Sequence, residues 1–86
     1  MQKTLIYTTP ICPYCVRAKR LLDEKNAPYE EVDVSRDFKL RQAMVQKAGG
    51  RMTVPQIFIG ELHIGGCDEL YALERAGKLD PLLNAA

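Results

Sequence analysis

Two cysteines separated by two residues, Cys12 and Cys15, are the side chains of this chain best suited to chemistry. They follow an apolar run with strand character, residues 4–8, and lead into a segment with helical character, residues 16–25. Pro13 fits the first position of a helix because its φ is fixed and it has no N–H to leave unpaired, which places Cys12 at the N-cap. This pair at a strand-to-helix junction predicts a reversible dithiol.

The position of each cysteine predicts a different role. Cys12 faces the free N–H groups of the helix start, so its thiolate gains hydrogen bonds from the backbone of Tyr14 and Cys15 and the positive end of the helix dipole. Lowering a thiol pKa from about 8.5 to about 6 takes roughly 3.4 kcal/mol, more than the ~2 kcal/mol a dipole supplies, so N–H donation, Arg17 and Lys19 must provide the rest. We therefore expect a moderately acidic Cys12 that attacks and a less accessible Cys15 that resolves.

Cysteines at this spacing also occur in zinc sites. Cys12 and Cys15 form a formal four-ligand set with His63 and Cys67, although the intervening stretch is far longer than in a zinc finger and His63 is expected on a strand. Redox chemistry is the preferred hypothesis, and no resident metal is expected. Cys67 is interpreted either as a small apolar residue at a helix start or as a redox-sensitive secondary thiol.

The composition limits the class of protein. The 86 residues include twelve basic and eleven acidic side chains, a formal net charge of +1, and 47% are hydrophobic, which fits a single domain, residues 1–86, with one core. Balanced charge argues against nucleic-acid binding, and no run reaches the roughly 18 apolar residues of a membrane span. Because the chain starts without a signal-like apolar region and its three cysteines cannot all pair internally, we expect it in the reducing cytoplasm. A monomer is also expected.

Hydrophobic periodicity and turn residues predict the element order β-α-β-α-β-β-α. Strands are expected at 4–8, 29–34, 54–59 and 62–64, and helices at 13–25, 38–48 and 69–76. A strand-helix-strand unit implies a parallel crossover and a two-residue turn implies a hairpin, so the predicted fold is α/β, with a four-stranded mixed sheet and three flanking helices.

Helix caps and core positions follow from the same pattern. Ser35 or Asp37 is expected to cap the second helix, and Asp68 can cap the last one. Spacing at i and i+4 predicts a buried stripe of Leu40, Met44 and Ala48 on the second helix, and Leu70 and Leu73 are expected to be buried on the last one. Phe38 is also interpreted as a core residue, and the tail is expected to dock through Leu79, Leu82 and Leu83.

Three motifs together give this chain a resemblance to a known family. They are Cys12-Pro13-Tyr14-Cys15, Thr53-Val54-Pro55 and Gly65-Gly66-Cys67-Asp68. In this order of elements the chain resembles the glutaredoxins of the thioredoxin-like fold over essentially its whole length, most of all the small bacterial dithiol glutaredoxins of the glutaredoxin 3 type. The resemblance implies a glutathione-dependent thiol-disulfide oxidoreductase, active in cell redox homeostasis and electron transfer. Glutathione is implied as the reductant co-substrate, with no bound cofactor, and disulfide-containing or glutathionylated proteins as partners.

The resemblance also implies a glutathione site beside Cys12. Pro55 is expected to follow a cis peptide bond, which leaves the backbone groups of Val54, next to Thr53, exposed to pair with the backbone of glutathione. Tyr14 is expected to pack beside the tripeptide.

The two ends of glutathione are assigned by the same resemblance. Gly66 lets the ligand approach closely, and the free N–H groups of Cys67 and Asp68 suit the γ-glutamyl carboxylate, whose neighbouring ammonium the Asp68 side chain can meet. Gln42 or Arg51 is expected to reach the glycine carboxylate.

One departure from the family pattern affects the glycine-carboxylate end of that site. Thr9 stands three residues before the first cysteine, where many relatives have a lysine. A competing class within the family is a glutathione-ligated iron–sulfur carrier, mostly associated with single-cysteine sites. Pro13 and the available Cys15 argue against that class, and a colourless protein with two rapidly titrating thiols would separate the two.

Overall fold

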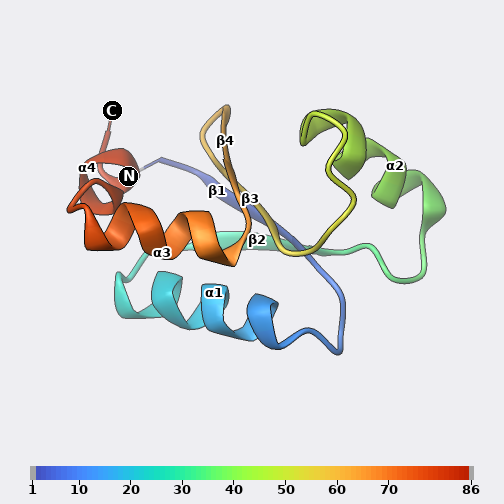
Figure 1. The fold of residues 1–86 in the computed structure, drawn as a ribbon, viewed down its shortest axis with the longest axis horizontal. Helices are drawn as coiled ribbons and strands as arrows, with labels where there is room; N and C mark the ends of the chain where they lie inside the picture. The colour runs from blue at the N-terminus through green and yellow to red at the C-terminus, as the bar shows by residue number, and fades with distance from the viewer. Residues whose placement is uncertain (1, 86) are drawn as a thin grey trace.

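A four-stranded mixed sheet in the order β2-β1-β3-β4 organises the computed structural model, which describes residues 2–85 (Figure 1). β1 (Thr4–Thr8) runs parallel to β2 (Tyr29–Asp33) and antiparallel to β3 (Gln56–Ile59), which pairs with β4 (Leu62–Gly65). Helix α1 (Pro13–Glu24) connects the parallel pair, and β3 and β4 form a hairpin. The predicted α/β class and mixed sheet are confirmed.

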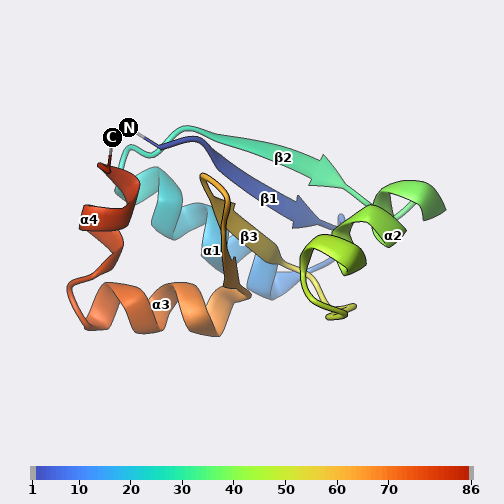
Figure 2. The same cartoon turned by 90° about the horizontal axis from the view of Figure 1, so that it is seen from above.

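Helices cover both faces of this sheet. α1 and α3 (Cys67–Arg75) contribute to one apolar cluster and α2 (Phe38–Lys47) to another, so the molecule has three layers (Figures 1 and 2). A short α4 (Leu79–Leu83) follows α3. The N–H of Gln2 donates to the carbonyl oxygen of Leu83 at 2.7 Å, which joins α4 to the start of the sheet.

The core is divided between these two clusters. The larger combines sheet residues with α1, α3 and α4, and it includes Ile6, Leu22, Ile57, Leu70, Leu79 and Leu83. The smaller lies under α2 and contains Tyr7, Val34, Met44, Ala48 and Phe58. Neighbouring residues of β1, Ile6 and Tyr7, belong to different clusters because side chains alternate across a strand. The strand that leads to Cys12 is thus buried on both faces.

Helix α2 buries a smaller face than the sequence predicts. Asp37, one of the two expected caps, is the N-cap, and its carboxylate accepts the N–H groups of Lys39 and Leu40 at 2.9 and 3.1 Å. Met44 is buried as predicted, but Phe38 is 73% exposed and Leu40 is 39% exposed, so their predicted core positions are wrong. Only the later turns of α2 reach the smaller cluster, and the apolar side chains of its first turn therefore stay in solvent.

Helix α3 starts two residues earlier than a cap at Asp68 would give. Its N-cap is Gly66 and its first residue is Cys67, so Asp68 is the second helical residue and its predicted capping role is wrong. The carboxylate of Glu69 accepts the N–H of Gly66 at 2.6 Å, which stabilises this earlier start.

The tail is helical rather than simply docked. Leu79 and Leu83 are both buried against the larger cluster, whereas Leu82 and the α3 residue Leu73 are only partly buried. An i, i+4 spacing places the two buried leucines on one face, so packing favours a helical turn and gives a fourth helix beyond the three expected. Within residues 2–85, no helix has the length and apolar character needed to cross a membrane.

Candidate active site

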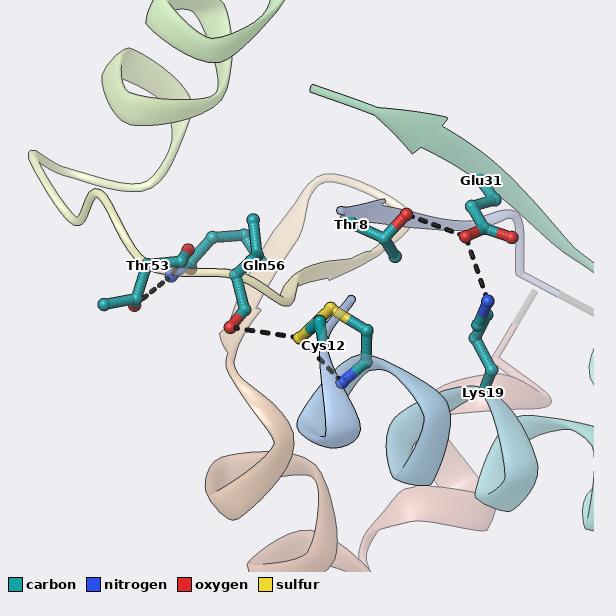
Figure 3. Close-up of a disulfide and its surroundings, with 8 residues drawn as sticks. Thr8, Cys12, Lys19, Glu31, Thr53 and Gln56 are labelled. Atoms are coloured by element: carbon teal, nitrogen blue, oxygen red, sulfur yellow. Dashed lines mark hydrogen bonds and ion pairs between the residues drawn. A yellow bond between two sulfur atoms is a disulfide. The ribbon is translucent and has the colours of Figure 1, made fainter. Parts of the chain in front are cut away.

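Cys12 and Cys15 form a disulfide at the start of α1, with their Cα atoms 5.2 Å apart (Figure 3). Cys12 is the N-cap in an extended conformation, with φ −149°, and Pro13 is the first helical residue, as predicted. Two cysteines inside a helix at i and i+3 would hold their Cβ atoms about 5–6 Å apart, too far for a disulfide. The bridge can close because the chain leaves helical geometry at Cys12.

The two sulfur atoms have different surroundings. Cys15 is 1% exposed, whereas Cys12 is only half-buried. The backbone N–H of Cys15 donates to Sγ of Cys12 at 3.1 Å, and the carbonyl oxygen of Val54 lies 3.9 Å from the same sulfur. The accessible sulfur therefore lies between a helix N-terminus and the backbone of a loop 42 residues away in sequence.

The two cations expected to support the Cys12 thiolate have other partners. The guanidinium of Arg17 lies 5.3 Å from the centroid of the Tyr71 ring. The ammonium of Lys19 is 3.0 Å from the carboxylate of Glu31, which also accepts the Thr8 hydroxyl at 2.7 Å (Figure 3). The Thr8 hydrogen bond, followed by that of Lys19, lowers the pKa of Glu31. Both cations thus interact with groups other than Cys12, whereas the backbone N–H of Cys15 at the helix start contacts the Cys12 sulfur.

A groove of about 290 Å³ lies beside the disulfide, between α1, the loop at 51–55 and the start of α3. Its lining residues are Tyr14, Arg51, Thr53, Val54, Pro55, Gly66, Cys67, Asp68 and Glu69. The Val54–Pro55 peptide bond is cis. Of the residues that the sequence suggests for glutathione, only Gln42 lies elsewhere, in a second groove between α2 and Met52.

Glu69 is a groove residue that the motif-based interpretation does not identify. Its carboxylate accepts the N–H of Gly66 and also pairs with the guanidinium of Arg51 at 2.9 Å. These interactions, the backbone bond most strongly, lower the pKa of Glu69. In the sequence, Glu69 stands three residues after Gly66. This is the spacing between the N-cap residue and the N3 residue of a capping box, and it could have identified Glu69. The pair with Arg51 connects two walls of the groove.

Cys67 and His63 have the surroundings of residues that pack and hydrogen-bond within the fold. Cys67 is a free, buried cysteine, and burial raises the pKa of its thiol. Nε2 of His63 is 2.7 Å from Oε1 of Gln56, and its ring stacks on Phe58. Across residues 2–85, no three His, Cys, Asp or Glu side chains converge on a common point suited to a metal. The structure therefore does not assemble the alternative zinc set.

These features define a class of protein. An accessible sulfur at a helix start, a buried partner one turn away and a peptide-sized groove beside them are the arrangement of a thiol-disulfide oxidoreductase. A mixed sheet with α1 and α3 on one face and α2 on the other, and with the dithiol at the start of α1, is the thioredoxin-like architecture.

Comparisons with known proteins give the family. A family model described as glutaredoxin matches residues 4–64. Over 85 residues the chain is 55% identical to a glutaredoxin of Pseudomonas aeruginosa, covering 99% of this chain and 100% of the relative. Over 83 residues it is 51% identical to glutaredoxin 3 of Escherichia coli, covering 96% and 99% of the two chains.

Solved structures give the same result. The solution structure of a glutaredoxin from Brucella melitensis matches with a TM-score of 0.85 and 57% identity, covering 96% of this chain and 89% of the other. A crystal structure of a buckwheat glutaredoxin–glutathione complex matches with a TM-score of 0.84 and 36% identity, covering 93% and 74%. The chain belongs to the glutaredoxin family and is a thiol-disulfide oxidoreductase, as its sequence predicts.

Proposed function

We propose that this protein uses glutathione to reduce protein disulfides and glutathione mixed disulfides, with Cys12 as the nucleophile and Cys15 as the resolving thiol. One observation carries the proposal: Sγ of Cys12 is at the start of α1, 3.9 Å from the Val54 carbonyl oxygen and beside the groove. The buckwheat relative was crystallised with glutathione, which supports the same ligand here. Glutathione is then a co-substrate rather than a resident cofactor.

The thiolate form of Cys12 is favoured by the local backbone. The N–H of Cys15 already points at Sγ of Cys12, and the positive end of the α1 dipole lies there as well. Cys15 is buried and so is protected from large disulfide substrates, while it remains close enough to bridge to Cys12. This asymmetry supports the assignment of attack to Cys12 and resolution to Cys15.

Two reaction sequences follow from these roles. With a protein disulfide, the Cys12 thiolate attacks one sulfur and forms a mixed disulfide while the other sulfur leaves as a thiolate. Cys15 then attacks the Cys12 sulfur, releases the reduced protein and leaves the Cys12–Cys15 disulfide, which two glutathione molecules reduce with formation of glutathione disulfide. With a glutathionylated protein, Cys12 takes over the glutathione and a second glutathione releases it as glutathione disulfide.

Glutathione binding is assigned to the groove. The backbone of Val54, flanked by Thr53 and Pro55, offers hydrogen bonds to the extended tripeptide, and Tyr14 packs along it. Because Gln42 lies outside the groove, we leave it out of the proposed site.

The γ-glutamyl end is assigned to the start of α3. The helical N–H groups of Cys67 and Asp68 suit its carboxylate, the Asp68 side chain suits its ammonium, and Gly66 admits the ligand without a side chain. Arg51 is the remaining candidate for the glycine carboxylate, although it is shared with Glu69.

The cellular setting is part of the same proposal. A dithiol that must return to its reduced form, together with the free thiol of Cys67, suits the reducing cytoplasm. There the protein would act as a monomer on disulfide-containing or glutathionylated proteins, in electron transfer and redox homeostasis.

The cysteine roles are tested with two serine variants. We expect Cys12→Ser to abolish every activity. Cys15→Ser should keep the release of glutathione from a glutathionylated protein, measured with glutathione reductase as the coupling enzyme, and lose most reduction of an intramolecular protein disulfide. Mass spectrometry should detect the stalled mixed disulfide in Cys15→Ser. Equal loss of both activities in this variant would contradict the assignment of Cys15 to resolution alone.

The glutathione site is tested at Asp68. Because Gly66 rather than Asp68 is the N-cap, Asp68→Asn keeps the cap and removes only a first-turn charge, which costs the helix about 0.3 kcal/mol at an exposed position. We expect its turnover at limiting glutathione to fall while its melting temperature stays close to that of the wild type. Unchanged dependence of turnover on glutathione concentration would rule out the binding role.

A further inference from the structure

Gln56 is a fully buried polar residue, 0% exposed, directly after the loop that forms one wall of the groove. Its Nε2 donates to the carbonyl oxygen of Thr53 at 2.9 Å and to the Thr53 hydroxyl oxygen at 3.2 Å. Its Oε1 lies 2.7 Å from Nε2 of His63 on β4. Figure 3 shows Gln56 and Thr53 joined in this way on the loop that faces Cys12.

The orientation of the Gln56 amide follows from its partners. The Thr53 carbonyl oxygen can only accept, so the amide nitrogen faces it and the amide oxygen faces His63. His63 must therefore carry a hydrogen on Nε2 and donate it to Gln56. The His63 ring is stacked on Phe58, with centroids 4.9 Å apart, which restricts its orientation. A chain of hydrogen bonds thus runs from β4 through the interior to Thr53.

The loop that accepts these hydrogen bonds is not part of the sheet and so lacks the backbone hydrogen bonds of a strand. Residues 51–55 lie outside the strands, and β3 begins only at Gln56. The next carbonyl along the loop, that of Val54, is the one 3.9 Å from Sγ of Cys12. Burying an amide is costly unless its hydrogen bonds are made, and an apolar side chain would fill the same space without that requirement. The use of glutamine here favours a role in holding the loop.

We propose that Gln56, supported by His63, is a positioning residue that holds the Thr53–Val54 backbone beside Cys12 so that it can pair with the extended backbone of the substrate. The inference rests on the proposed function, and it adds a requirement on residues that do not touch substrate. The hydrogen bonds to Thr53 limit motion of the Val54 peptide before substrate arrives, which lowers the entropy cost of docking.

The test uses Gln56→Met, which keeps the length of the side chain without its hydrogen bonds, and His63→Phe, which keeps a ring to stack on Phe58. For Gln56→Met we expect KM for a glutathione mixed disulfide to rise roughly tenfold, the scale of one good hydrogen bond, with little change in kcat. Alkylation of reduced Cys12 by iodoacetamide, which needs no docking, should keep its rate. His63→Phe should raise KM by only about threefold, because the hydrogen bonds from Gln56 to Thr53 remain and only their support by His63 is lost.

A second readout is independent of glutathione. The ¹⁵N order parameter of the Val54 amide should fall from a rigid value of about 0.85 toward about 0.6 in Gln56→Met. Thr4→Val is the matched control, because the Thr4 hydroxyl is buried at the other end of the β1–β3 pair and has no partner within residues 2–85. Both KM and the Val54 order parameter should be unchanged in Thr4→Val.

The possible outcomes separate the proposals. A Gln56→Met protein with a lower melting temperature but wild-type KM and Val54 order would show that Gln56 is only a core residue, which overturns the inference. If Gln56→Met does not fold, His63→Phe decides by the same two measurements. If the wild type fails to turn over the glutathione substrate, the proposed function is wrong, while the order parameter of Val54 still decides the positioning role.

Discussion

Replacement of Glu69 by alanine removes two interactions of one carboxylate. Glu69 accepts the N–H of Gly66 at the start of α3 and pairs with Arg51 across the groove. The side chains of Glu69 and Arg51 are each 45% exposed, so solvent screens both interactions and each is given no more than the typical value for an exposed site. We assign about 1 kcal/mol to the backbone bond and about 0.5 kcal/mol to the ion pair.

The predicted loss in Glu69→Ala is therefore about 1.5 kcal/mol, which corresponds to a fall in melting temperature of roughly 6–12 °C for a domain of this size. The loss should depend on pH. Because the pKa of Glu69 is lowered in the folded state, its stabilisation is present above the unfolded value of about 4.3 and is lost as pH falls through the folded value. The difference between wild type and variant should thus be largest near neutral pH and shrink below about pH 4.

Thermal unfolding followed by circular dichroism, at neutral pH and at about pH 3.5, measures both the loss of stability in Glu69→Ala and its dependence on pH. Glu69→Gln should lose less than Glu69→Ala, because its amide oxygen can still accept the N–H of Gly66. Glu24→Ala is a control for the change in net charge, since Glu24 is an exposed carboxylate of α1 without an ion-pair partner within residues 2–85. A fall in melting temperature that is equal at both pH values would refute the attribution to the ionised carboxylate.

Three further predictions concern stability. Met44→Ala should lower the free energy of unfolding by about 2–5 kcal/mol in urea denaturation, because Met44 is fully buried in the smaller cluster. Asp37→Ala should cost about 1 kcal/mol in the same assay by removing the cap of α2, and Asp37→Asn should recover most of it. The pKa of Glu31 is lowered by the Thr8 hydroxyl and then by Lys19, so the advantage of the wild type over Glu31→Gln should disappear as pH falls below about 4, measured by thermal unfolding.

Much of the fold could be predicted because its signals are local. The order of strands and helices follows from periodicity within short windows, and the position of Cys12 as N-cap follows from the neighbouring Pro13. The predictions failed where burial depends on what lies opposite. Leu40 has the i, i+4 spacing of a buried helix face with Met44, and Phe38 is an apolar residue of the same first turn. Both are nevertheless exposed, because the first turn of α2 meets no partner in the core.

The sequence by itself determined the chemistry of the site: a dithiol at a helix start, since its residue types and spacing act within one turn of the chain. Only the tertiary structure decided what surrounds that dithiol. The pairing of Glu69 with Arg51 spans 18 residues, and the approach of Val54 to Cys12 spans 42. Neither pairing has a local pattern, because each exists only after the sheet has brought the loop at 51–55 and the start of α3 to the start of α1.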